Sequence, residues 1–436
     1  GQAVFYSMHH IFLTKSGVYL LVFDMREILE ESEEAYGYIE FWLKSIRLHA
    51  PEAPLLLVGT FRDDVDTRRR WRLVNDIVQD LTKVSASQLV RNTSDGLCFY
   101  PIDNKSKAGI PKLRSTVEAV VRQDINIAQE VSIKWILFLD AILSERKTKS
   151  YMSLNEIRHT AEAAGIHSVR EREEALNLFH NRGMLFHLTS TEKLREITVI
   201  KPQWLVDNLS MVIRDGNLHM FNRRDFEEAG LGDDLRTAFK NALASRAFLS
   251  YVWKNDQIDF FVDLMKHTML LCEWDFKSGF YLVPSLLEQK FLGDVNDWLF
   301  LQSGLQCTFD FTPTFLPSGI FQRLICLCVQ YSCQQVNSKD LKKPKLFKDY
   351  ASIELRPGSK IHLQEDSELS YIVVSMEDDF MPCFQLLAEM IERINSELMG
   401  TGLIWDSFLQ DESTGEFIEF EEARVHGLSP WFDTSP

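Results

Sequence analysis

Pro54-Leu-Leu-Leu-Val-Gly-Thr-Phe-Arg-Asp63 is an apolar run that ends at small residues and is followed by an acid. The run Leu55 to Val58 is too short for a helix and does not alternate with polar residues. Such a run is typical of a strand that is buried on both faces of a parallel sheet. Ligands of open parallel sheets bind beyond the carboxyl ends of the strands, so we expect Thr60, Phe61 and Asp63 to lie at a ligand site.

Asp63 is the residue of this stretch that can select a base. Its carboxylate can accept two hydrogen bonds. Guanine offers two neighbouring donors, N1–H and the exocyclic amino group, whereas adenine offers no such pair on that edge. The alternative is that Asp63 and Asp64 are turn acids before a helix capped near Asp66. The order of the surrounding elements favours the first interpretation.

The sequence pattern predicts alternating strands and helices over residues 1–127. Apolar runs over 17–23 and 97–102 predict two buried strands in addition to the one at 55–58. Between and after them, apolar residues at helical spacing predict helices around 36–46, 74–81 and 113–121. Alternation of this kind predicts a parallel sheet with helices on its faces.

Three motifs in this order resemble a known family. Thr60-Phe-Arg-Asp63 resembles the guanine-specifying Asn/Thr-x-x-Asp motif of small GTPases, in the form used by Roc domains of the ROCO family. Gly1-Gln2 resembles the end of the Asp-x-x-Gly-Gln motif, and Tyr100-Pro-Ile-Asp-Asn-Lys105 lies where the family places the loop that lines the base. The resemblance implies that Gln2 is catalytic and orients the attacking water. It implies that the nucleotide-binding residues are Gly1, Thr60, Phe61, Asp63, Asn104 and Lys105.

Two features depart from the family pattern. Phe61 stands where a lysine or histidine is usual, so a charge is lost, although an aromatic ring can still stack on a base. The sequence also contains no Gly-x-x-x-x-Gly-Lys-[Ser/Thr] loop. We therefore expect residues 1–127 to be the C-terminal part of a Roc GTPase-like domain, a partial Ras-like parallel sheet. GTP or GDP with Mg²⁺ is expected in the full-length protein, and no metal ligand is assigned in this chain.

Residues 128–275 are predicted to form an α+β unit. We expect, in order, three helices and a hairpin over 131–145, 153–164, 170–182, 184–188 and 196–200. This order is winged-helix-like, but the third helix carries as many acids as arginines, so we do not expect it to bind nucleic acid. The segments 178–187 and 200–205 closely resemble the first half of the COR domain, which follows Roc in the family.

Residues 276–398 are predicted to form a mixed α+β unit. We expect strands and then a helix over 308–311, 324–331, 351–355, 371–375 and 387–398. Cys326 and Cys328 alternate within 324–329, which places both on one face of the second strand. The stretch 315–325 resembles the second half of COR, the dimerising part of the family, so the resemblance implies a homodimer. The acid-rich residues 399–436 are predicted to be a tail or linker.

Composition limits the class of protein. The chain has 436 residues and a net charge of −16, which argues against nucleic acid or an anionic membrane surface as a main partner. The seven cysteines are scattered, and we expect reduced thiols and a cytoplasmic protein. No apolar run approaches the length of a membrane-spanning helix, so we expect no membrane insertion.

These observations lead to two hypotheses from different classes. In the first, the chain is the Roc-COR segment of a ROCO-type intracellular signalling protein. The full-length protein would then hydrolyse GTP, couple this cycle to COR-mediated dimerisation and bind other signalling proteins. In the alternative, the chain is a non-catalytic COR interaction scaffold with a vestigial nucleotide site. No protein-kinase motif such as His-Arg-Asp followed by Asp-Phe-Gly occurs in the sequence.

Overall fold

A computed structural model gives the fold of the chain. It describes residues 13–14, 17–85, 87–123, 131–213, 223–287, 290–291, 305–335, 342–376, 380–411, 413–429 and 431–432. The chain combines α-helices with β-sheets, as the sequence predicted. Its described residues divide into two compact units. One comprises the chain up to His187 together with Thr198–Pro202, and the other comprises Leu188–Ile197 together with the chain from Gln203 onward.

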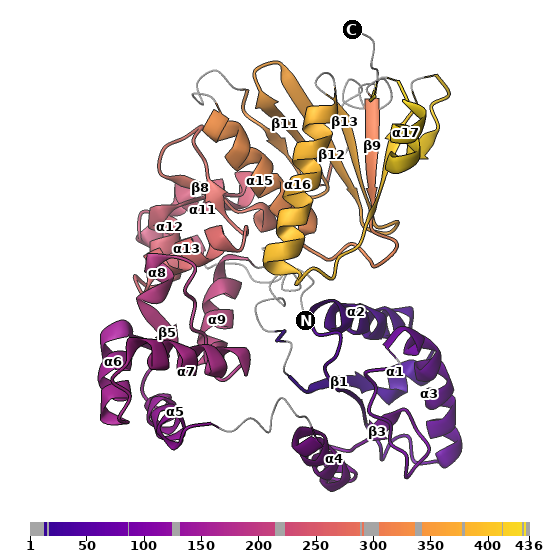
Figure 1. Cartoon of the computed structure of the whole chain (residues 1–436), viewed down its shortest axis with the longest axis vertical. Coiled ribbons are helices and arrows are strands. Elements are labelled where there is room, and N and C mark those ends of the chain that lie inside the picture. Colours follow the sequence, from indigo (N-terminus) through magenta and orange to yellow (C-terminus); the bar gives the residue numbers. More distant parts are fainter. Residues whose placement is uncertain are drawn as a thin grey trace. The chain divides into compact units, whose positions relative to one another are not determined.

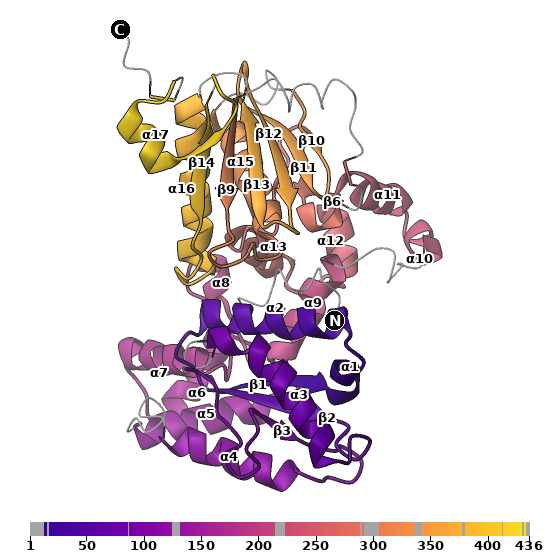
Figure 2. The same cartoon turned by 90° about the vertical axis from the view of Figure 1, so that its right-hand side faces the viewer.

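The first unit begins with a three-stranded parallel sheet in the order β1-β2-β3 (Figures 1 and 2). Its strands are β1 (Tyr19–Asp24), β2 (Leu55–Thr60) and β3 (Phe99–Pro101). Its helices are α1 (Met25–Leu29), α2 (Glu33–His49), α3 (Arg68–Leu81), α4 (Ile110–Gln123) and the 3-10 helix Lys83–Ser85. The predicted alternation is confirmed, and the short helix α1 was not predicted.

Strand β2 is the centre of this sheet. Leu55, Leu56 and Leu57 have no exposed surface, because strands pair on both sides of β2 and side chains cover both of its faces. Strand β1 differs, since β2 is its only partner among the described strands. Leu20 and Val22 on β1 are 45% and 46% exposed.

An open strand with exposed apolar side chains is an aggregation site. We therefore predict that residues 1–127 aggregate when they are expressed alone. Light scattering of the purified fragment measures this directly. A dispersed monomer with a cooperative unfolding transition would contradict the prediction.

The rest of the first unit contains helices and short strands. In chain order these are α5 (Ile133–Glu145), β4 (Tyr151–Ser153), α6 (Leu154–Ala163) and α7 (Val169–Asn181). The three predicted helices are confirmed. In place of a long hairpin, Phe186 and Val199 exchange two backbone hydrogen bonds of 2.8 and 2.9 Å. Strand β5 (Ile197–Val199) also pairs with β4.

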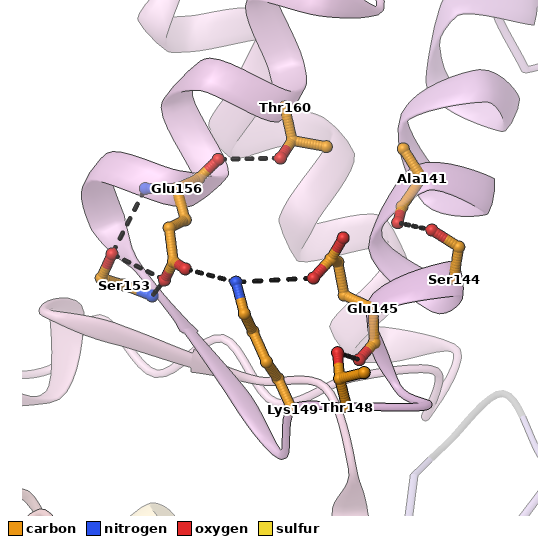
Figure 3. Close-up of polar contacts among 8 residues, drawn as sticks. All are labelled: Ala141, Ser144, Glu145, Thr148, Lys149, Ser153, Glu156 and Thr160. Carbon is orange, nitrogen blue, oxygen red and sulfur yellow. Dashed lines mark hydrogen bonds and ion pairs between the residues drawn. The ribbon is translucent and has the colours of Figure 1, made fainter.

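Helix α6 begins with a reciprocal capping box. The Ser153 hydroxyl accepts a hydrogen bond from the Glu156 amide at 3.3 Å, and the Glu156 carboxylate accepts one from the Ser153 amide at 2.8 Å. Lys149 Nζ lies 2.6 Å from the same carboxylate and 3.4 Å from that of Glu145 (Figure 3). Hydrogen bonds from Lys149 and Ser153 lower the pKa of Glu156 to about 2.

Replacing Ser153 with alanine is expected to lower the free energy of unfolding by about 1 kcal/mol, because a helix N-terminal amide loses its partner. Ser132 is a matched control, since it occupies the N-cap of α5 without a side-chain capping bond. Ser132→Ala should therefore leave stability almost unchanged. Urea unfolding of both variants at pH 7 makes the comparison, and equal losses would contradict the capping role.

Glu156 should make this stabilisation depend on pH. An unfolded glutamate titrates near pH 4.3, whereas the pKa of Glu156 in the folded chain is about 2. The contribution of its charge is therefore complete above about pH 5 and is lost as the pH falls through 4 toward 2. The stability difference between the wild type and Glu156→Gln should shrink over this window. A difference that stays constant from pH 7 to pH 3 would reject the prediction.

The second unit contains a helical part with a three-stranded antiparallel sheet in the order β6-β8-β7. Its helices are α8 (Glu192–Arg195), α9 (Pro202–Val212), α10 (Arg223–Glu228), α11 (Gly232–Asn241), α12 (Arg246–Val252), α13 (Ile258–His267) and the 3-10 helix Pro284–Leu286. Its strands are β6 (Leu243–Ser245), β7 (Cys272–Glu273) and β8 (Phe280–Leu282).

A seven-stranded sheet in the order β10-β11-β12-β13-β9-β14-β15 completes the second unit (Figure 2). The strands are β9 (Leu305–Asp310), β10 (Lys345–Leu346), β11 (Tyr350–Arg356), β12 (Ser359–Asp366), β13 (Tyr371–Met376), β14 (Asp406–Gln410) and β15 (Phe417–Glu419). The helices are α15 (Ile320–Gln335), α16 (Phe380–Leu398) and α17 (Phe420–His426). Phe309 of β9 stacks on Phe384 of α16 with ring centroids 5.5 Å apart. The Ser332 hydroxyl of α15 donates to the Glu354 carbonyl of β11 at 2.6 Å.

Two expectations for this region are wrong. The predicted strand 324–331 lies within α15, so Cys326 and Cys328 do not share a strand face. Both thiols are buried, because residues 323–329 of α15 are buried on every face of the helix. Residues 399–436 are not simply a tail or linker, since β14 pairs with β9 inside the sheet. The described cysteines are all free thiols, as expected.

Candidate functional site

The predicted ligand site begins where β2 ends. The parallel register places Asp24 of β1 beside Thr60 of β2. The Thr60 hydroxyl donates to the Phe23 carbonyl at 3.0 Å, which ties the ends of the two strands together. Phe61 follows with φ +60°, in the left-handed region, and its side chain is 39% exposed. Thr60 therefore anchors the turn, and Phe61 faces solvent from it.

The loop after β3 is organised around Asp103. One oxygen of its carboxylate accepts hydrogen bonds from the amides of Lys105 at 2.8 Å and Ser106 at 3.0 Å. The other oxygen lies 3.5 Å from the Asp63 amide. These amides, led by that of Ser106, lower the pKa of Asp103 below its usual value. A charged, nearly buried carboxylate thus joins the loop that carries Asp63 to the loop that carries Lys105.

Backbone hydrogen bonds fix the same two loops. The Ile102 amide donates to the Gly59 carbonyl at 2.8 Å, and the Arg62 amide donates to the Ile102 carbonyl at 3.1 Å. Gly109 closes the second loop with φ +79°, and a Cβ there would lie 2.2 Å from the Pro101 carbonyl oxygen. Only glycine satisfies both the conformation and the space at this position.

The side chains that would meet a ligand are available. Asp63, Asn104 and Lys105 are exposed. Among the residues that the structure describes, no hydrogen bond or ion pair engages the carboxylate of Asp63. A free carboxylate with two acceptor oxygens is what recognition of guanine requires. The residues present at this edge of the sheet therefore fit a guanine base.

The structure brings some of the predicted site residues together. Thr60, Phe61 and Asp63 lie on the loop after β2, and Asn104 and Lys105 lie on the adjoining loop after β3. Gly1 and Gln2 lie outside the described residues.

Sequence reasoning did not assign a role to two residues of this site. One is Asp103, although an acid followed by Asn-Lys-Ser is a usable turn signal. The other is Arg26, whose guanidinium carbon lies 3.4 Å from the centroid of the Phe61 ring.

A second surface lies on α5 and α7 of the same unit. A groove of about 230 Å³ is lined almost entirely by apolar side chains, namely Val131, Ile136, Leu139, Leu178, Phe179 and Met184, together with Arg182. Ile133 and Leu137 on α5 are also exposed, at 73% and 54%. An exposed apolar patch of this kind is typical of a protein contact site.

Two other features, a metal site and a membrane-spanning helix, are absent from the described ranges. No cluster of three or more His, Cys, Asp or Glu side chains there could hold a metal ion. No helix in that part of the chain is long and apolar enough to cross a membrane.

Comparison with known proteins gives a family match. The family model of the COR-A domain, C-terminal of Roc, matches residues 132–287. "Probable serine/threonine-protein kinase pats1" of Dictyostelium discoideum is 24% identical over 357 residues, which are 76% of this chain and 10% of that protein. "Probable serine/threonine-protein kinase roco5" of the same organism is 26% identical over 216 residues, which are 49% of this chain and 7% of that protein. The chain thus spans at most about a tenth of these relatives.

One solved structure is also similar. The structure of Methanosarcina barkeri Roco2 RocCORdC bound to GDP aligns with 66% of this chain and 78% of that chain, at 18% identity and a TM-score of 0.44. The family relation rests on the COR-A match and on the sequence relatives. Residues 132–287 thus match the COR-A domain, and the chain is similar to kinases of the Roco family.

Proposed function

We propose that the chain is the Roc-COR segment of an intracellular signalling protein, and that the full-length protein binds guanine nucleotides at the edge formed by β2 and β3. The carboxylate of Asp103 carries this proposal. It draws the amides of Asp63 and Lys105 to one point, beyond the carboxyl ends of two adjacent parallel strands. Ligands of open parallel sheets bind at such an edge.

Each side chain would have a distinct role toward the base. The free carboxylate of Asp63 accepts hydrogen bonds from N1–H and the exocyclic amino group of guanine. The exposed ring of Phe61 stacks on the base, and Asn104 and Lys105 line the base from the second loop. Gly1 would contact the terminal phosphate and Gln2 would orient the attacking water. Mg²⁺ supplies charge for the phosphates in the full-length protein.

The domain assignment and the coupling to dimerisation belong to the same proposal. Residues 1–127 form the C-terminal part of a Ras-like Roc domain, 128–275 a winged-helix-like first half of COR, and 276–398 its dimerising second half. A groove between α15 and α16 of that second half offers a surface for a second copy. It is lined by Leu327, Gln330, Tyr331, Gln334, Leu386, Glu389, Met390 and Arg393.

Titration of fluorescently labelled GDP and ATP against the full-length gene product tests the nucleotide site. Selective binding of GDP supports the proposal. Equal affinity for both nucleotides would contradict base recognition. A folded protein that binds neither nucleotide would contradict the nucleotide site itself. Light scattering of the same samples with GDP and with a non-hydrolysable GTP analogue tests whether the nucleotide changes the oligomeric state.

A second candidate is an interaction scaffold whose nucleotide site is vestigial. The apolar groove on α5 and α7 favours it, because that surface needs no nucleotide to bind a partner. Ile133→Lys and Ile136→Lys should then abolish capture of a partner protein from lysate. Under this hypothesis GDP and the GTP analogue would leave capture unchanged, whereas a nucleotide-dependent loss favours the switch.

A further inference from the structure

The Phe61 ring is already covered on one face by a cation. The Arg26 guanidinium carbon lies 3.4 Å from the ring centroid, within the range of a cation–π contact. The ring nevertheless remains partly exposed. One face of the aromatic side chain is therefore occupied by Arg26, and exposed surface is left for a ligand.

Two carboxylates hold Arg26 in this position. Its Nε and Nη2 lie 3.2 and 2.9 Å from the two oxygens of Asp24, which is a bidentate arrangement. Its Nη1 lies 3.2 Å from Asp64. The Arg26 amide also donates to Asp24 at 2.8 Å, because Asp24 caps α1. The carboxylates of Asp24 and Asp64 thus contact all three nitrogens of the Arg26 guanidinium.

The sheet explains how residues so far apart in sequence meet. Asp24 ends β1 and Thr60 ends β2, and the parallel register makes them neighbours. Arg26, two positions after Asp24, is therefore close enough to contact Phe61, which follows Thr60. Arg26 thus supplies a positive charge directly beside the Phe61 ring.

We infer that Arg26 is a positioning residue for the guanine base, acting through Phe61 as the rear layer of a stack of guanidinium, ring and base. This inference rests on the proposed nucleotide site. Bases stack on aromatic side chains, and a cation behind the ring withdraws electron density from the face that meets the base. The same contact fixes the orientation of the Phe61 ring, so less conformational entropy is lost when the base binds.

A double-mutant cycle in the full-length protein tests this inference. The variants are Arg26→Ala, Phe61→Leu and the pair together, titrated with GDP and with inosine diphosphate, which lacks the exocyclic amino group. Arg26→Ala is expected to weaken both ligands equally, by about two- to fivefold. The double variant should bind no more weakly than Phe61→Leu alone, because Arg26 acts through the ring.

The cycle separates stacking from two simpler effects. Loss of Arg26 also leaves Asp24 and Asp64 unpaired, and repulsion of an anionic ligand would persist in the Phe61→Leu background as an additive loss. Disturbance of the Asp63 loop would reduce the preference for GDP over inosine diphosphate, which stacking leaves unchanged. Arg114→Ala is the charge-matched control, since Arg114 is exposed on α4 and lies 3.7 Å from Glu118.

Unchanged or tighter binding by Arg26→Ala, an additive double variant, or an altered preference between the two ligands would each overturn the role of Arg26. These outcomes require a wild type that binds GDP. A folded wild type that binds neither ligand overturns the proposed nucleotide site itself and the role of Arg26 with it.

Discussion

Replacing Asp63 with alanine is expected to weaken binding of GDP to the full-length protein by about a hundredfold. Each hydrogen bond to a charged group contributes roughly 1.5–3 kcal/mol, and 1.4 kcal/mol corresponds to a factor of ten. In the proposed site, two such bonds from guanine would end on this carboxylate, which no other described residue engages. Affinity for GDP measured by fluorescence titration gives the result.

Asp66→Ala is the control for charge on the same loop. Asp66 is also exposed, and replacing it with alanine removes the same charge. Asp66 lies beyond the turn, however, next to Thr67, which caps α3. It should change affinity by less than about threefold, because an exposed charge at that distance is screened. The wild type should also prefer GDP to inosine diphosphate, and Asp63→Ala should lose that preference. An unchanged preference would show that Asp63 does not read the exocyclic amino group.

Gly109→Ala is expected to lower the free energy of unfolding by roughly 2–4 kcal/mol. The left-handed backbone at φ +79° opposes any Cβ, and the added atom would also meet the Pro101 carbonyl oxygen at 2.2 Å. That oxygen belongs to β3 and cannot turn aside as a flexible side chain would. Urea unfolding measures the loss.

Gly96→Ala is the matched control for this substitution. Gly96 has a similar φ of +68°, but an added Cβ would meet nothing within 4 Å. It therefore carries only the conformational cost, about 1 kcal/mol. Equal losses at Gly96 and Gly109 would show that the approach of Pro101 is not what fixes the second loop.

Local sequence pattern was sufficient for the parallel sheet and failed in the seven-stranded sheet. The run Leu55 to Val58 has no polar residue because β2 is buried on both faces, and the pattern identified it as a strand. The similar run 324–329 is a helix. A helix that is buried all round loses its polar side, so a short apolar run cannot distinguish it from a buried strand.

Strands β12, β14 and β15 were not predicted, and they differ in how clear their sequence signal is. In β12 the apolar Ile361 and Leu363 alternate with polar residues, so its signal was present in the sequence. In β14 and β15 the strands are short and lie among acids, and pairing with β9 stabilises β14. Such tertiary pairing outweighs a weak local preference.

The candidate site shows the same limit. Thr60, Phe61 and Asp63 could be found because they follow directly from a recognisable strand. Arg26 carries no local signal, since its contact with Phe61 depends on the register of β1 with β2. Pairing between strands far apart in sequence is information that a single sequence does not display.

The central position of β9 has a consequence for synthesis of the protein. β9 spans Leu305–Asp310, but its partners β13 and β14 follow much later, at Tyr371–Met376 and Asp406–Gln410. At roughly 5–20 residues per second, β9 leaves the ribosome several seconds before either neighbour exists. Two rows of unpaired amides and carbonyls stay open during that interval. Translation speed and chaperone supply should therefore govern the yield of native protein more strongly through this sheet than through β1, β2 and β3.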